Sequence, residues 1–64
     1  MRTFRGTAAN AMVTTVRLEE GPGHDRVHIW NRGGKAGVLT VNVGDGIRCV
    51  WRLFGPSEWE EEQA

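Results

Sequence analysis

Residues 26–43, RVHIWNRGGKAGVLTVNV, decide the fold. Residues 26–31 alternate, with Val27 and Ile29 on one side of a strand and His28 and Trp30 on the other, and residues 37–43 alternate in the same way. Between them, residues 32–35 contain two glycines and predict a turn. A two-residue period on both sides of a short glycine turn is typical of a β-hairpin, so we expect two antiparallel strands here.

The same period continues toward the N-terminus. Residues 12–20 alternate apolar and polar side chains, and residues 21–25, GPGHD, predict the turn that joins them to the hairpin. We therefore expect a three-stranded antiparallel meander, or a four-stranded one if residues 2–6 add an edge strand.

After the strands, the period changes from two to 3.6. Apolar side chains at Ile47, Val50, Trp51 and Phe54 predict an α-helix, with Asp45 at its N-cap and a stop at residues 55–56, GP. Residues 57–60, SEWE, have the spacing of a capping box, which allows a short second helix at the end of the chain.

These elements predict an α+β fold of two layers, in which one C-terminal helix packs on one face of a small antiparallel sheet. Residues 1–55 form the single domain and residues 56–64 an acidic C-terminal tail. The expected core face carries Met12, Val16, Leu18, Val27, Ile29, Leu39, Val41 and Val43, and the opposite face carries Val13, Arg17, His28, Trp30 and Val38.

The helix has more apolar surface than one contact with the sheet requires, because Cys49 and Leu53 widen its apolar side. A homodimer would cover this surface, since two-fold dimers are the commonest oligomers. Alternatively, residues 1–11 or Trp59 fold over it.

Length and composition limit the class of protein. The 64 residues suffice for one domain, and the single cysteine, Cys49, excludes an internal disulfide. No apolar run approaches the roughly 20 residues of a membrane span, and the opening residues 1–5 lack the apolar segment of a signal peptide. We expect a cytoplasmic protein.

The net charge of zero hides an asymmetry. Residues 1–55 hold all eight Arg and Lys against four acids, whereas the other four acids lie within residues 58–62. A basic body favours an anionic partner, and the acidic end either occupies the same surface or keeps the protein soluble.

Catalytic and metal chemistry find no support in the residue pattern. His24 and His28 lack further ligands at metal-site spacing, and Cys49 lies mid-helix on the apolar side, where thiols are normally inert. The pair formed by residues 34–35, GK, lacks the flanking residues of a phosphate-binding P-loop. We expect no catalytic residue, no metal and no cofactor, and therefore a protein that is not an enzyme.

The candidate ligand site surrounds the glycine turn. Backbone N–H groups of the turn favour phosphate or carboxylate, and an indole beside them offers a stacking plane for a base. The alternative is an ordinary hairpin turn with solvated cations. The predicted ligand-binding residues are Trp30, Arg32, Gly33, Gly34, Lys35, Arg17 and His28, with Arg48 as a further cation.

This site predicts a small binding protein that sequesters an anionic, nucleotide-like ligand. The alternative is a module that binds nucleic acid or inhibits a host protein through the same face.

Residues 27–39, VHIWNRGGKAGVL, resemble short uncharacterised proteins encoded by bacteriophages, particularly those of actinobacteria. The resemblance covers about a fifth of the chain and transfers no residue role. It implies an accessory factor that inhibits or sequesters a host component, including nucleotide immune signals.

Overall fold

The computed structural model describes residues 1–32, 34–56 and 58–62. The elements follow the order β1 (Arg2–Thr7), β2 (Val13–Glu19), β3 (Asp25–Asn31), β4 (Gly34–Val41), α1 (Gly46–Phe54) and β5 (Trp59–Glu62). All strand pairs are antiparallel, and the spatial order is β4-β3-β2-β1-β5. The α+β class is confirmed, but the sheet has five strands rather than three or four.

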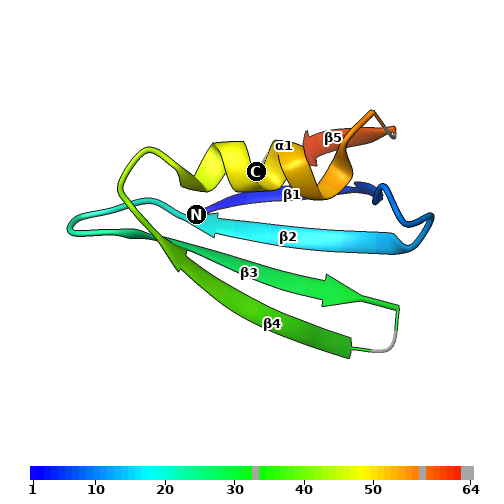
Figure 1. The fold of residues 1–64 in the computed structure, drawn as a ribbon. Helices are drawn as coiled ribbons and strands as arrows, with labels where there is room; N and C mark the ends of the chain where they lie inside the picture. The colour runs from blue at the N-terminus through cyan, green and yellow to red at the C-terminus, as the bar shows by residue number, and fades with distance from the viewer. Residues whose placement is uncertain (33, 57, 63–64) are drawn as a thin grey trace.

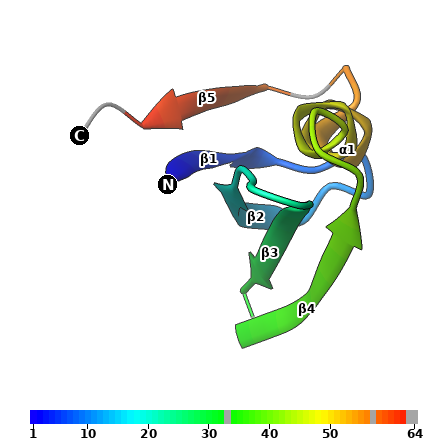
Figure 2. The ribbon, with the colours of Figure 1, turned by 90° about the vertical axis from the view of Figure 1, so that its left-hand side faces the viewer.

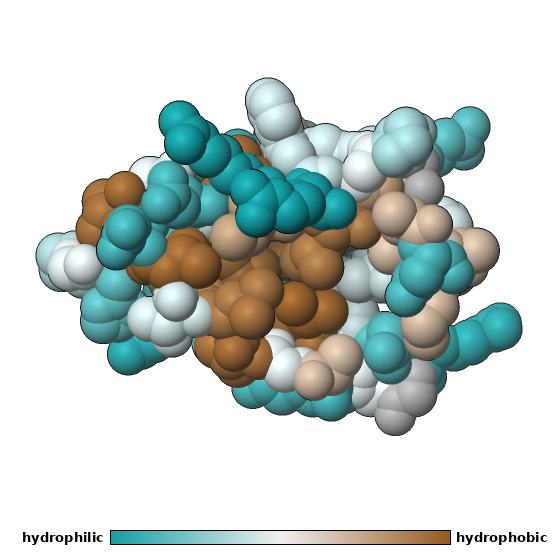
Figure 3. All heavy atoms as spheres, viewed as in Figure 1, coloured by the Kyte–Doolittle hydropathy of each residue, from teal (hydrophilic) through white to brown (hydrophobic). Residues whose placement is uncertain are grey.

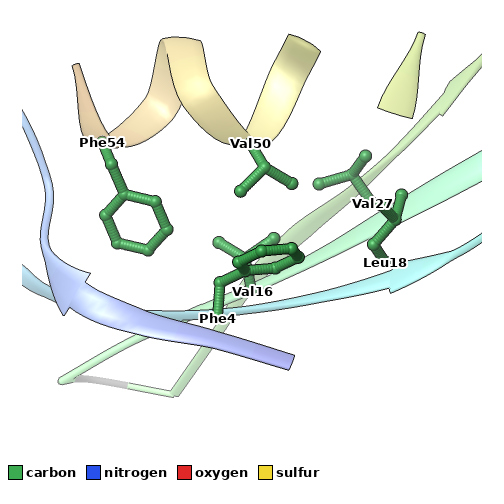
Figure 4. Close-up of a cluster of buried hydrophobic side chains, with 6 residues drawn as sticks. All are labelled: Phe4, Val16, Leu18, Val27, Val50 and Phe54. Atoms are coloured by element: carbon green, nitrogen blue, oxygen red, sulfur yellow. The ribbon is translucent and has the colours of Figure 1, made fainter. Parts of the chain in front are cut away.

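The sheet is strongly twisted, and α1 lies on one of its faces (Figures 1 and 2). Four side chains of the sheet meet two side chains of the helix in the core, as Figure 4 shows: Phe4, Val16, Leu18 and Val27 below, and Val50 and Phe54 above. Each of these six is at most 1% exposed. The predicted positions of Val16, Leu18 and Val27 are confirmed.

Part of the predicted core was wrong, because α1 does not extend over the whole sheet. Leu39 points to the helix side of the sheet, opposite Val27, yet it is 45% exposed because α1 packs on β1, β2 and β3. Met12 (39% exposed) and Val43 (58% exposed) lie outside the strands. Ile29 and Val41 are only partly buried.

The last strand replaces the predicted tail and the alternative second helix within residues 59–62. The Trp59 ring stacks on Phe54, with centroids 5.3 Å apart, and meets the edge of Phe4 at 5.6 Å. Gly6 lies opposite Trp59, and a Cβ there would collide with the backbone of β5. The N-terminal residues and Trp59 thus cover apolar surface of the helix within one copy of the chain.

A side chain of β3 holds the N-terminus of α1. Asp45 occupies the N-cap position as predicted, but its side chain makes no capping hydrogen bond. Instead the Asp25 carboxylate, 1% exposed, accepts hydrogen bonds of 3.0 Å from the backbone N–H groups of Gly21, Gly44 and Gly46. These bonds, that from Gly21 first, hold the pKa of Asp25 below its ordinary value. The predicted stop is confirmed, because Gly55 has a φ of 58° and its N–H donates to the Trp51 carbonyl.

Helix α1 has nine residues, and within the described ranges no helix is long and apolar enough to cross a membrane.

Candidate functional site

The face of the sheet opposite α1 carries an aromatic and cationic cluster. Strand pairing aligns Thr15 of β2, Trp30 of β3 and Lys35 of β4 in one row, and Arg17 and His28 in the next. Because directly opposed residues point to the same side of an antiparallel sheet, these side chains share one surface. We call Arg17, His28, Trp30 and Lys35 the Trp30 cluster, and the surface that bears it the open face.

Trp30 lies at the centre of the cluster. The Arg17 guanidinium carbon is 5.3 Å from the centroid of the indole, and the Lys35 ammonium nitrogen is 5.5 Å from it. The His28 ring stacks beside the indole at 6.0 Å with an interplanar angle of 23°. Distances below about 6 Å are those of cation–π contacts, so two cations from different strands are held against one ring.

The structure places six of the seven predicted ligand-binding residues. The structure brings together Arg17, His28, Trp30 and Lys35 on the open face, whereas Arg32 lies in the exposed turn between β3 and β4. Gly34, with a φ of 119°, begins β4 opposite Asn31 rather than lying in the turn. Gly33 lies outside the described residues, so the predicted backbone nest remains a prediction.

The further cation, Arg48, belongs to a different surface. It lies on α1, which covers the other face of the sheet, and its guanidinium is 3.8 Å from the Asp45 carboxylate. Within one copy of the chain it lies on the side of the sheet opposite Trp30, so its part in the ligand site remains a prediction.

Some charged side chains of the open face form ion pairs and others do not. The side chains of Arg5 and Glu62 form an ion pair of 3.1 Å. Glu19 lies 3.3 Å from His28 and 3.9 Å from Arg26. By contrast, Arg17, Arg32 and Lys35 form no ion pair within residues 1–32, 34–56 and 58–62. The cations nearest Trp30 are therefore those available to an external anion.

Sequence reasoning missed two kinds of residue on this face. Thr15 lies directly opposite Trp30 and contributes a hydroxyl to the row, and Arg5 enters the face through β1. The alternation of residues 12–20 already placed Thr15 beside Arg17, but the pairing partner of each residue was needed to bring Thr15 to Trp30.

The Trp30 cluster lies on a surface rather than in a pocket. Three hollows of about 350, 430 and 390 Å³ on the described surface are lined by none of its four residues, although Arg5 of the open face lines the first. Among the described residues no group of three or more His, Cys, Asp and Glu side chains is arranged to hold a metal ion. The chemistry that the cluster offers is stacking with the indole and charge pairing with Arg17 and Lys35.

Comparisons with protein families, curated proteins and solved structures find no match to this chain.

Proposed function

We propose that the protein is a non-enzymatic binding module whose open face binds single-stranded nucleic acid. The observation that supports this proposal is the contact of Trp30 with two cations, Arg17 and Lys35, that have no ion-pair partner among the described residues. A sheet surface that combines an aromatic plane with flanking cations suits a single strand, whose bases stack while its phosphates pair with the cations.

Binding on this face exchanges one set of contacts for another. In the free protein the indole is half-buried beneath Arg17 and Lys35. An incoming base would take the place of at least one cation against the ring, and that cation would turn to the adjacent phosphate. Both side chains are exposed and flexible, so the exchange needs no movement of the backbone.

The second candidate is sequestration of a small nucleotide-like anion, as a phage-type accessory factor would do. It is favoured by the presence of a single indole on the described part of the face and by Glu60 of β5, whose negative charge lies toward one side of it and disfavours a long polyanion. The two candidates share the base and phosphate chemistry but differ in the length of ligand that they require.

A direct test measures fluorescence anisotropy of a labelled oligothymidylate titrated with the protein. The Trp30→Ala variant should bind about 5- to 150-fold more weakly, the loss that corresponds to about 1–3 kcal/mol of stacking per base. Trp51→Ala is the matched control, because Trp51 is 61% exposed on α1, and this helix covers the opposite face of the sheet. Equal affinity of the two variants would refute the proposed site.

Salt dependence and competition distinguish the candidates. If Arg17, Arg32 and Lys35 neutralise two or three phosphates, affinity should fall about 7- to 18-fold between about 50 and 200 mM salt. A mononucleotide that competes as strongly as the oligomer at equal concentration would favour sequestration, and failure of both ligands to bind would contradict both candidates.

A further inference from the structure

The two edges of the sheet differ in how they are protected. Strand β5 is four residues long, and three of them are glutamates. Two copies of β5 would place like charges side by side, which is how natural sheets prevent edge pairing. Strand β4, at the opposite edge, is eight residues long and contains one charged residue, Lys35. In Figure 1 no further element lies beyond it.

A bulge divides β4 into two parts. The register with β3 shifts between Ile29 and Trp30, so that Ile29 faces Gly37 whereas Trp30 faces Lys35. The five residues from Gly37 to Val41 pair regularly with β3 and are uncharged. This segment has the features of an edge that accepts another strand: regular, neutral and free of proline.

We propose that the occupant of this edge is a second copy of the chain, paired antiparallel through β4 about a two-fold axis. In a continuous antiparallel sheet, facing residues point to the same side, and a two-fold axis normal to the sheet keeps each side chain on its own side. Two residues can then face each other across the axis only if they are an even number of positions apart.

The segment from Gly37 to Val41 meets this condition if the two-fold axis passes beside its middle residue, Leu39. Leu39 then faces the partner's Leu39, Gly37 faces the partner's Val41, and Val38 faces the partner's Thr40. No charged side chain faces another across this seam.

Exposed apolar side chains support this arrangement. Leu39 is 45% exposed on the helix side and Val38 is 42% exposed on the open face, so both faces of the seam carry apolar surface. Figure 3 shows apolar side chains gathered on the surface of the molecule in the view of Figure 1. The pairing covers Leu39, which α1 leaves uncovered.

The dimer would enlarge the open face. Because the two-fold axis is normal to the sheet, both Trp30 clusters lie on the same side of a ten-stranded sheet. Three strand spacings of about 4.8 Å and an offset of about six residues at about 3.4 Å place them about 25 Å apart. A single strand long enough to reach both would bind bivalently. This consequence rests on the proposed function, whereas the dimer itself does not.

Cysteine cross-linking tests the seam without nucleic acid. In a Cys49→Ser background, Leu39→Cys places two thiols opposite each other, at a Cα separation of about 4.5–5.5 Å that a disulfide can bridge. Mild oxidation should give a covalent dimer that migrates at twice the monomer mass. Val13→Cys in the same background is the control, because Val13 is 59% exposed on β2, away from both edges. On a denaturing gel this variant should show little covalent dimer.

Sedimentation at micromolar concentration provides the second measurement. The wild type and Val13→Lys should sediment as dimers and Leu39→Lys as a monomer, with far-UV circular dichroism confirming that each is folded. A monomeric wild type, a dimer unaffected by Leu39→Lys, or open-ended fibres would overturn the proposal.

Trp30→Ala separates the two proposals, because it should remain dimeric while losing oligonucleotide affinity. If the dimer forms and binds no oligonucleotide, the seam stands and the proposed function fails. Oligonucleotides that span about 25 Å should lose more affinity than shorter ones when Leu39→Lys separates the copies, and an equal loss for both lengths would contradict the bivalent arrangement.

Discussion

Replacing Trp59 by alanine tests whether the end of the chain is an integral part of the fold. Trp59 is half-buried, stacks on Phe54 at 5.3 Å and contacts Phe4 at 5.6 Å. Each aromatic pair contributes about 0.5–1.5 kcal/mol beyond area burial, and truncation of buried Trp to Ala costs about 3–5 kcal/mol. Since Trp59 is only partly buried, we expect a loss of about 2–4 kcal/mol in the free energy of unfolding.

This loss is large for a domain of this size. A 64-residue domain has a total stability of about 3–10 kcal/mol. With a urea m-value of about 1 kcal/mol/M, the unfolding midpoint should fall by about 2–4 M. Far-UV circular dichroism is the suitable probe, because the substitution itself changes the tryptophan fluorescence.

Trp51→Ala is the control for this measurement. Trp51 is 61% exposed in the middle of α1, where alanine is a better helix former, so its replacement should change stability by no more than about 0.5 kcal/mol. If Trp59→Ala destabilises the protein no more than Trp51→Ala does, β5 does not belong to the stable sheet and the five-stranded topology is wrong.

Three further predictions concern the buried carboxylate, the β5 contact and an ion pair. Because the folded pKa of Asp25 lies below its ordinary value of 3.8, its ionised form stabilises the fold at neutral pH, and this contribution is lost as pH falls through 3.8 toward the lowered pKa. Asp25→Asn should therefore be less stable at pH 7 and lose less stability on acidification, and parallel acid-unfolding curves by circular dichroism would contradict this. Gly6→Val should displace β5 and remove hydrogen-exchange protection from residues 59–62, whereas Gly37→Ala, which has open space around its Cβ position, should keep it; retained protection in Gly6→Val would show that β5 does not require this close approach. Finally, Arg2 donates hydrogen bonds of 2.9 and 3.0 Å to the Glu61 carboxylate and lowers the pKa of Glu61. Arg2→Gln should therefore raise the pKa of Glu61 toward 4.5, as measured by NMR titration. An unchanged pKa would count against this ion pair.

The strands and helix of residues 12–55 could be predicted because their periods are local. Alternation placed Arg17, His28 and Trp30 on one face, and pairing confirms it. The turn was predicted too long: only residues 32–33 separate β3 from β4, so Lys35 lies in the strand opposite Trp30. That shift creates the cation–π contact with Lys35, and it depends on the register, which the local pattern does not determine.

The end of the chain could not be predicted from its own residues. Residues 59–62 are WEEE, a sequence with low intrinsic strand preference apart from Trp59. They form a strand because Gly6 allows close approach and Arg2 and Arg5 pair with Glu61 and Glu62, contacts between opposite ends of the chain. Propensity is overridden here by tertiary contacts.

The exposure of Leu39 follows from the dimensions of the two layers. A helix of nine residues is about 14 Å long and about 10 Å wide, whereas five strands span about 19 Å. One such helix cannot cover the whole sheet, and it lies over β1, β2 and β3. The alternating pattern correctly assigned Leu39 to the helix side but carried no information on the reach of the helix.

The measurement that tests the central claim most directly is an NMR titration of the three tryptophan indole N–H signals with a short oligothymidylate. The proposed site predicts that the Trp30 signal shifts progressively while those of Trp51, on the helix, and Trp59, packed against the core, remain in place. Shifts confined to Trp51 or Trp59, or no shift at all, would contradict the assignment of the open face as the binding surface.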